Sequence, residues 1–129
     1  MKFSTKAEYG LRAIVALDKT GEKPVSLAQI SKKEEISLSY LERLFSQLKK
    51  AGLIKADIGV NGGYYLNRPA KEINILEIVE ALEGSVAPFS CVDGAGACHG
   101  CKCKIHPVWD TLYSQVKKTL REITLEQIM

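Results

Sequence analysis

The sequence predicts a mainly α-helical protein with one small β-hairpin, arranged as a winged helix-turn-helix domain followed by a long C-terminal dimerisation helix. Three observations support this class: apolar residues at helical spacing before residue 50, two short apolar runs around a glycine-rich turn, and another helical stripe near the C-terminus. Three helices followed by such a hairpin form the element order of a winged helix. We expect a winged-helix domain over 1–84, a cysteine-rich loop over 85–106, and a dimerisation helix with a C-terminal turn over 107–129.

The first two helices are marked by their boundary residues. The first is expected to begin at Ser4, before Thr5, and to stop near residues 20–21, where Thr-Gly interrupts the pattern. Ser26 is followed three residues later by Gln29, a capping-box pattern that satisfies free backbone donors reciprocally. A short helix over 27–33 should follow. Its expected buried residues are Leu27, Ala28 and Ile30.

The segment ISLSYLERLFSQLKKAG, residues 36–52, has the most regular helical pattern in the chain. Ser37 suits the N-cap, and Gly52 suits the left-handed residue that follows a helix. Between the apolar positions lies a polar face with varied hydrogen-bond donors and acceptors. The predicted apolar stripe consists of Leu38, Leu41, Leu44, Phe45 and Leu48.

The pattern then changes from helical to strand-like. The runs LIKADI and YYLN, on either side of GVNGG, predict a β-hairpin over residues 53–67. Asn74 and Glu77 form a second capping-box pattern, which predicts a helix that ends at Gly84. Pro107 suits the first turn of the last long helix, and a short turn is expected in TLEQIM. The stripe of that long helix, which can pack across a two-fold axis of a homodimer or on the chain's own core, is Trp109, Leu112, Val116, Leu120 and Ile123.

The charge distribution favours a polyanionic partner for the front half of the chain. Residues 1–70 carry 12 Lys and Arg against 7 Asp and Glu, whereas residues 71–129 carry 6 against 8. In a winged helix, the second helix of the pair enters the major groove and the hairpin reaches the minor groove or phosphates. Arg43 can bond guanine, whereas Glu42 can accept from cytosine and repels phosphate, so that it acts in selectivity. The same element order also serves in protein-interaction modules.

The expected contacts with double-stranded DNA fall into three groups. Residues of the predicted recognition helix near bases and phosphates are Ser37, Ser39, Tyr40, Glu42 and Arg43. Candidates for sequence-independent phosphate contacts are Lys2, Lys6, Lys32, Lys33 and Lys55. Residues at the hairpin tip are Asn61, Gly62 and Gly63.

The segment CVDGAGACHGCKCKIH, residues 91–106, contains all four cysteines and both histidines of the chain. Glycines let a loop fold closely around a bound group, and an unexported protein does not keep disulfides, so this clustering predicts metal or cluster ligation. Cys98 and Cys101 have the spacing of a zinc half-site, yet the whole pattern matches no standard finger. Iron–sulfur clusters tolerate irregular spacing, so spacing alone leaves zinc and iron–sulfur open.

Several other classes are not expected. No apolar run approaches the roughly 20 residues that span a bilayer, and the N-terminus lacks an apolar signal-peptide core, so a cytoplasmic protein with no membrane association is predicted. An enzyme is not expected, because outside the loop there is no histidine, no cysteine and no nucleophile–base constellation.

Over essentially its whole length the chain resembles the Rrf family of bacterial transcription regulators, above all its IscR-like iron–sulfur sensors. The resemblance lies in FSTKAEYGLRAI, ISLSYLERLFSQLKKAGLI, GGYYL and the cysteine loop running into HPVW. It implies a homodimeric winged-helix repressor or activator that binds operator DNA, with a long C-terminal helix crossing the dimer. It also implies cluster-assembly machinery as a further partner, and a role for Glu42 in operator discrimination.

The resemblance also implies a ligand set. Three loop cysteines and a following histidine of IscR-like proteins align with Cys91, Cys98, Cys103 and His106, which implies a 2Fe-2S cluster. Two departures stand out. Cys101 is an extra thiol that could replace Cys103 or His106, with His99 a weaker competitor, and Ile58 occupies a hairpin position where relatives often carry arginine. In NsrR-like members a carboxylate near the N-terminus of the partner is a ligand of a 4Fe-4S cluster, and Glu8 lies in that region. A structural zinc site is the third alternative.

Overall fold

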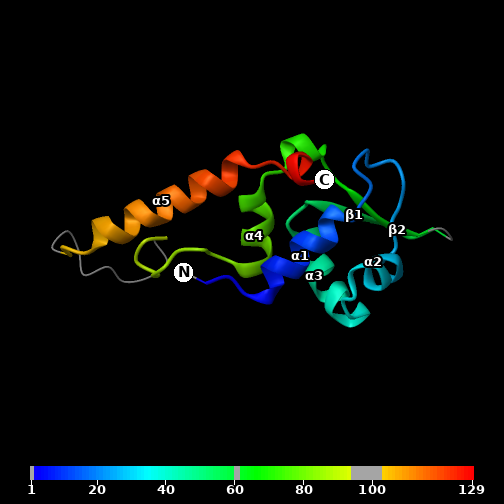
Figure 1. Cartoon of the computed structure of the whole chain (residues 1–129), viewed down its shortest axis with the longest axis horizontal. Coiled ribbons are helices and arrows are strands. Elements are labelled where there is room, and N and C mark those ends of the chain that lie inside the picture. The colour runs from blue at the N-terminus through cyan, green and yellow to red at the C-terminus, as the bar shows by residue number, and fades with distance from the viewer. Residues whose placement is uncertain (1, 60–61, 94–102) are drawn as a thin grey trace.

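The computed structural model describes residues 2–59, 62–93 and 103–129. They form a helical body from which a two-stranded hairpin projects at one end and a long helix extends at the other (Figure 1). The elements are α1 (Thr5–Val15), α2 (Leu27–Glu34), α3 (Leu38–Lys50), β1 (Ile54–Asp57), β2 (Gly63–Leu66), η1 (Ala70–Glu72), α4 (Ile75–Glu83), α5 (His106–Glu122) and η3 (Leu125–Ile128). The predicted class, mainly α with one hairpin, is confirmed.

Helix α1 begins where predicted and ends earlier than predicted. Ser4 caps it and accepts a hydrogen bond from the amide of Lys6, but the helix stops at Val15 rather than near residues 20–21. The reason is the Asp18 side chain, which accepts from the hydroxyl of Thr20 at 2.6 Å and from the amide of Lys23 at 2.8 Å. Such local bonds offer the backbone an alternative to the helix.

Helices α2 and α3 agree with their predicted bounds to within one residue. The capping box of Ser26 with Gln29 is present, and Ser37 accepts from the amide of Tyr40. The predicted burial of Ala28 was wrong, because Ala28 is exposed, and Leu38 of the predicted apolar stripe is 44% exposed. Both residues lie in the first turn of their helix on the side away from the core, which receives Ile30, Leu41, Leu44, Phe45 and Leu48.

The hairpin pairs Ile54 with Leu66 and Asp57 with Gly63 in antiparallel register. The sequence pattern did not predict a third participant. Val25, before α2, forms a bridge with Tyr64 through two backbone hydrogen bonds of 3.1 and 2.9 Å. The ring of Tyr64 meets that of Phe45 edge-on, with centroids 5.0 Å apart. The hairpin therefore contacts the segment before α2 through Val25 and helix α3 through Phe45.

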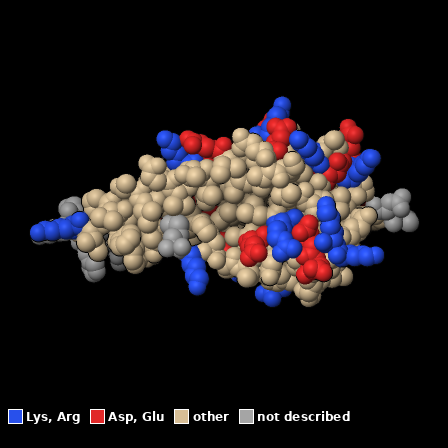
Figure 2. Space-filling view, in the orientation of Figure 1, with Lys and Arg blue, Asp and Glu red and all other residues tan. Residues whose placement is uncertain are grey.

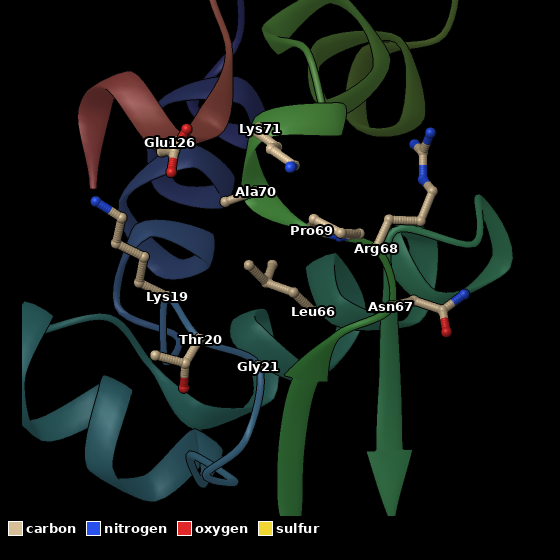
Figure 3. A pocket seen from close by; sticks show the side chains of 10 residues that line it. All are labelled: Lys19, Thr20, Gly21, Leu66, Asn67, Arg68, Pro69, Ala70, Lys71 and Glu126. Carbon is tan, nitrogen blue, oxygen red and sulfur yellow. The ribbon is translucent and has the colours of Figure 1, made fainter.

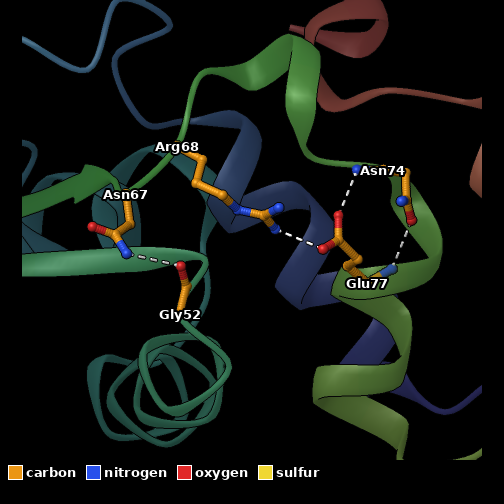
Figure 4. Close-up of polar contacts among 5 residues, drawn as sticks. All are labelled: Gly52, Asn67, Arg68, Asn74 and Glu77. Atoms are coloured by element: carbon orange, nitrogen blue, oxygen red, sulfur yellow. Dashed lines mark hydrogen bonds and ion pairs between the residues drawn. The ribbon is translucent and has the colours of Figure 1, made fainter.

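Polar contacts attach the base of the hairpin to its neighbours (Figure 4). The Asn67 side chain donates to the carbonyl of Gly52 at 3.0 Å. Arg68 forms an ion pair with Glu77 at 2.6 Å, and the same carboxylate accepts from the amide of Asn74 in the predicted capping box. The end of β2 is thereby connected to the first turn of α4.

The C-terminal segment returns to the body. Ile75 donates its amide to the carbonyl of Ile123, and Leu125 donates to the carbonyl of Ile73. Leu125 is fully buried in the same core as the residues of α1, α3 and α4. Only the first part of α5 extends away as an arm (Figure 1). Along the described ranges, we find no helix with the length and apolarity that crossing a membrane requires.

Candidate functional site

The outer face of α3 is set by the residues that the opposite face buries. Because Leu41 and Leu44 point into the core, helical periodicity turns the side chains between them outward. Ser39, Glu42 and Arg43 are accordingly exposed. Neither Glu42 nor Arg43 belongs to an ion pair of the described residues, where the pairs are Arg12–Glu34 and Arg68–Glu77. The side chains of Glu42 and Arg43 are therefore free to meet a partner, whereas that of Ser37 caps α3.

Tyr40 differs from its neighbours on this face because it is half-buried against α1. Its ring meets that of Tyr9 edge-on, with centroids 5.9 Å apart. Its hydroxyl lies 3.2 Å from Oγ1 of Thr5. The predicted DNA-contacting residue is thus also a contact between two helices, which the sequence pattern did not reveal.

The hairpin presents a mixed surface. The ammonium of Lys55 lies 5.7 Å from the ring centroid of Tyr65, whose hydroxyl donates to Asp57 at 3.1 Å. Desolvation and this hydrogen bond raise the pKa of Tyr65 above its ordinary value, so its hydroxyl stays protonated. Ile58 is 99% exposed at the position where an arginine was expected from the resemblance. Gly62 is half-buried, and Asn61 lies outside the described residues.

The basic residues predicted to contact phosphate are all on the surface. Lys2 and Lys6 are exposed at the start of α1, and Lys32 and Lys33 are exposed on α2. In the view of Figure 2, charged side chains of both signs gather over the body, and the face of the arm that is turned to the viewer shows fewer of them.

The two ends of the cysteine-rich loop come together at one aromatic contact. The ring of Phe89 packs on that of Trp109, with centroids 5.0 Å apart at 64°. Cys91 follows Phe89 by two residues, and His106 precedes Trp109 by three at the first position of α5. Cys91, Cys103 and His106 are half-buried, and both thiols are free. The contact thus brings the segment that follows Cys91's neighbour Phe89 near the first turn of α5, which begins at His106.

The remaining predicted ligands, Cys98 and Cys101, and the competitor His99 lie outside the described residues. Within the described residues, no three or more His, Cys, Asp or Glu side chains form a group able to hold a metal ion. The donor types fit an iron–sulfur group, because thiolates and imidazole are its usual protein ligands. Glu8, the alternative ligand, is exposed on α1.

The predicted dimer stripe divides into two parts. Leu120 and Ile123 pack against the chain's own core, whereas Leu112 is 40% exposed and Val108, beside the stripe, is 60% exposed. Next to the buried part lies a mainly apolar groove of about 340 Å³. It is lined by Phe3, Ser4, Thr5, Ala7, Glu8, Leu11, Ile75, Val79 and Leu120. The exposed part of α5 at Val108 and Leu112 and the groove are both apolar.

A larger cavity, of about 450 Å³, lies between the loop after α1, the end of β2 and the C-terminal turn (Figure 3). None of the predicted site residues lines it. Its walls are Lys19, Thr20, Gly21, Leu66, Asn67, Arg68, Pro69, Ala70, Lys71 and Glu126.

Comparison with known proteins agrees with this architecture. Residues 3–129 match the family model Rrf2, described as an iron-dependent transcriptional regulator. The chain is 41% identical over 135 residues to the transcriptional regulator IscR of Cereibacter sphaeroides, covering all of this chain and 87% of the relative.

Two solved structures support the winged-helix fold. CymR, the global cysteine regulator of B. subtilis, superposes with a TM-score of 0.82 at 34% identity, covering 99% of this chain and 95% of that one. T. potens IscR superposes with a TM-score of 0.74 at 35% identity, covering 99% and 85%. These relatives are transcriptional regulators rather than enzymes, as predicted. The chain belongs to the Rrf2 family of DNA-binding transcriptional regulators.

Proposed function

We propose that this transcription regulator senses iron–sulfur status or redox stress through a 2Fe-2S cluster in its cysteine-rich loop. The proposed ligands are Cys91, Cys98, Cys103 and His106. The observation that carries the proposal is the packing of Phe89 on Trp109, because it closes the loop and brings ligand-bearing segments from both ends together. When bound, the cluster would supply a one-electron redox centre that oxidants destroy.

The environment of the described donors suits such a group. Half-burial of Cys91 and Cys103 limits solvent access while leaving the thiols available. Proteins adjust the reduction potential of a cluster by limiting its exposure to water and by donating backbone hydrogen bonds to its sulfurs.

The proposed readout is the choice of operator. Arg43 and Glu42 at the start of α3 would meet base edges, and the hairpin would contact the adjacent backbone. Cluster gain or loss would alter the pose of α3 and thereby shift the protein between two DNA-binding modes. A cytoplasmic location and contact with cluster-assembly machinery belong to the same proposal.

The proposal includes a homodimer, because a dimer presents two recognition helices to a two-fold operator. The exposed part of the arm, with Val108 and Leu112, would enter the apolar groove of a second copy or pack on its arm. The exposure of Ile105, Val108 and Leu112 supports this assignment, since exposed apolar surface of this kind is typical of protein interfaces.

The first experiment is native mass spectrometry on protein purified without oxygen. A dimer that carries two irons and two sulfides per protomer is expected. One zinc per protomer without sulfide would contradict cluster sensing and would assign the loop to a structural zinc site. Loss of the cluster mass in Cys91→Ala and Cys103→Ala would support these ligands.

The second experiment measures the effect of the cluster on DNA binding. An operator is first selected from a randomised duplex library, and its affinity is then compared by fluorescence anisotropy at constant salt for protein with and without cluster. A change in affinity or in preferred sequence is expected. Equal affinity for every selected duplex would contradict the sensing function.

A second candidate is a 4Fe-4S sensor of the NsrR type with Glu8 as a ligand. The observation that favours it is the position of Glu8 on the wall of the groove proposed for a second copy. A four-iron mass that is lost in Glu8→Gln would support this candidate over the 2Fe-2S sensor.

A further inference from the structure

The last residue of α4 holds the first turn of α1. One carboxylate oxygen of Glu83, Oε1, accepts from the amide of Ser4 at 2.8 Å and from its hydroxyl at 2.5 Å. The same oxygen lies 3.3 Å from the amide of Ala7, which donates to it. These bonds satisfy donors that a helix start leaves free, and the negative charge suits the positive end of the helix dipole. Residues 79 positions apart are thereby joined.

Helix α4 cannot slide freely past α1 at this point. A Cβ atom on Gly10 would lie 2.2 Å from Cδ1 of Leu82, so the absence of a side chain there lets the two helices approach closely. Leu82 is buried and directly precedes Glu83. A displacement of the end of α4 would therefore move the start of α1 with it, because packing and hydrogen bonds hold the same two segments.

The chain leaves α4 directly into the cysteine-rich loop. Gly84 ends the helix with φ +80°, a conformation that suits glycine, and the loop begins at residue 85. Glu83 is consequently the last helical residue before the segment that carries the proposed cluster ligands. A change in the path of the loop reaches Glu83 through Gly84 and through Val86, which is buried in the core.

The start of α1 is in turn in contact with the recognition helix. Thr5 Oγ1 lies 3.2 Å from the hydroxyl of Tyr40, and the ring of Tyr9 packs edge-on against that of Tyr40. Tyr40 lies in the first turn of α3, two residues before Glu42. Described contacts thus run from the end of α4 through α1 to the predicted DNA-reading turn.

We propose that Glu83 is a positioning residue that couples the cysteine-rich loop to the recognition helix through the first turn of α1. This inference rests on the proposed function, in which the loop changes state. A change in the loop displaces Glu83, the hydrogen bonds to Ser4 carry the displacement into α1, and the contacts of Thr5 and Tyr9 transfer it to Tyr40. Glu83 itself needs no contact with DNA or with the cluster.

The first test is hydrogen exchange, which needs neither cluster nor operator. Glu83→Ala should raise exchange in peptides covering residues 4–8 and 37–41 by several-fold, because both lose a restraint. Glu80→Ala, an exposed glutamate one turn earlier on the same helix, is the matched control and should leave both peptides unchanged. Glu83→Gln, which keeps the shape and one acceptor oxygen, provides a milder variant if Glu83→Ala does not fold. Faster exchange at 4–8 with no change at 37–41 would overturn the inference.

The second test compares the effect of the cluster in two proteins. The operator affinity of cluster-loaded protein is divided by that of cluster-free protein, for the wild type and for Glu83→Ala. A wild-type ratio of about 5 or more, typical of coupled sites, should fall towards 1 in the variant while both its forms still bind DNA. A residue with only a structural role would weaken both forms equally and leave the ratio unchanged.

The outcomes separate the two proposals. A wild-type ratio of 1 would overturn the sensing function and the regulatory role of Glu83 with it. A large wild-type ratio that persists in Glu83→Ala would overturn only the coupling through Glu83. Native mass spectrometry checks that the wild type and Glu83→Ala contain the same amount of cluster, so that a difference between their ratios cannot come from cluster loss.

Discussion

Gly63 lies so close to Val25 that a Cβ atom on it would be 2.8 Å from the carbonyl carbon and oxygen of Val25. The next residue, Tyr64, exchanges two backbone hydrogen bonds with Val25. This close contact joins the segment before α2 to the hairpin, so α2, α3 and the hairpin keep fixed positions relative to one another. Because the neighbouring atoms belong to the backbone, they cannot rotate away from an added side chain.

Gly63→Ala should therefore destabilise the protein by about 1–3 kcal/mol, the usual range for overpacking. Gly59→Ala is the matched control, since its Cβ would make only an ordinary contact of 3.5 Å with Asp57. Urea unfolding followed by circular dichroism measures the free energy of unfolding of both variants. Equal stability of Gly63→Ala and the wild type would show that Val25 can move aside.

Glu42→Ala should relax operator choice. The exposed carboxylate repels phosphate and accepts only from particular bases, so its removal raises affinity for disfavoured duplexes more than for the preferred one. Discrimination of about 1–3 kcal/mol at one base pair is expected to be lost. Fluorescence anisotropy over a panel of single-base variants of a selected operator checks this. Unchanged relative affinities across the panel would argue against a role in selectivity.

The Arg68–Glu77 pair should contribute modestly to stability. Both side chains are more than a third exposed, so a coupling of about 0.2–1 kcal/mol is expected, falling at high salt. A double-mutant cycle with Arg68→Met and Glu77→Gln isolates the pair from the separate bond of Glu77 to Asn74. A coupling energy that does not change between low and high salt would contradict an electrostatic origin.

The turn around Asp18 should weaken in acid. The hydroxyl of Thr20 and then the amide of Lys23 hold the pKa of this carboxyl below its ordinary value of 3.8. A depressed folded-state pKa means that the stabilisation is complete above the unfolded value and is lost as pH falls through the lower folded value. The stability difference between wild type and Asp18→Asn should be constant above that ordinary value and shrink below it. An NMR titration of the Asp18 carboxyl that gives an ordinary or raised pKa would refute this.

Leu112→Glu should dissociate the proposed dimer, because it places a charge on the exposed apolar side of α5. Ser114→Glu adds the same charge to an exposed position on the other side of the helix and should leave assembly unchanged. Sedimentation velocity over a range of concentrations compares the two variants. A dimer that survives Leu112→Glu would place the interface elsewhere on the chain.

Local elements could be predicted because their signals are local. The caps at Ser4, Ser26, Ser37 and Asn74 depend on side chains within three residues of the bonds they make, and the structure confirms all four. The end of α1 was predicted wrongly for the same kind of reason. The bonds of Asp18 to the following turn outweigh the helical pattern that continues through Leu17.

The sequence by itself determined the helices, the hairpin and the clustering of soft ligands in one loop, because these depend on periodicity, capping and spacing. Tertiary structure alone decided that Val25 pairs with Tyr64, that Phe89 meets Trp109, and that Glu83 holds Ser4. It also decided that Leu120 packs inward while Leu112 stays exposed. These relationships join residues far apart along the chain, and they form only when the helices pack, which no local pattern of side chains encodes.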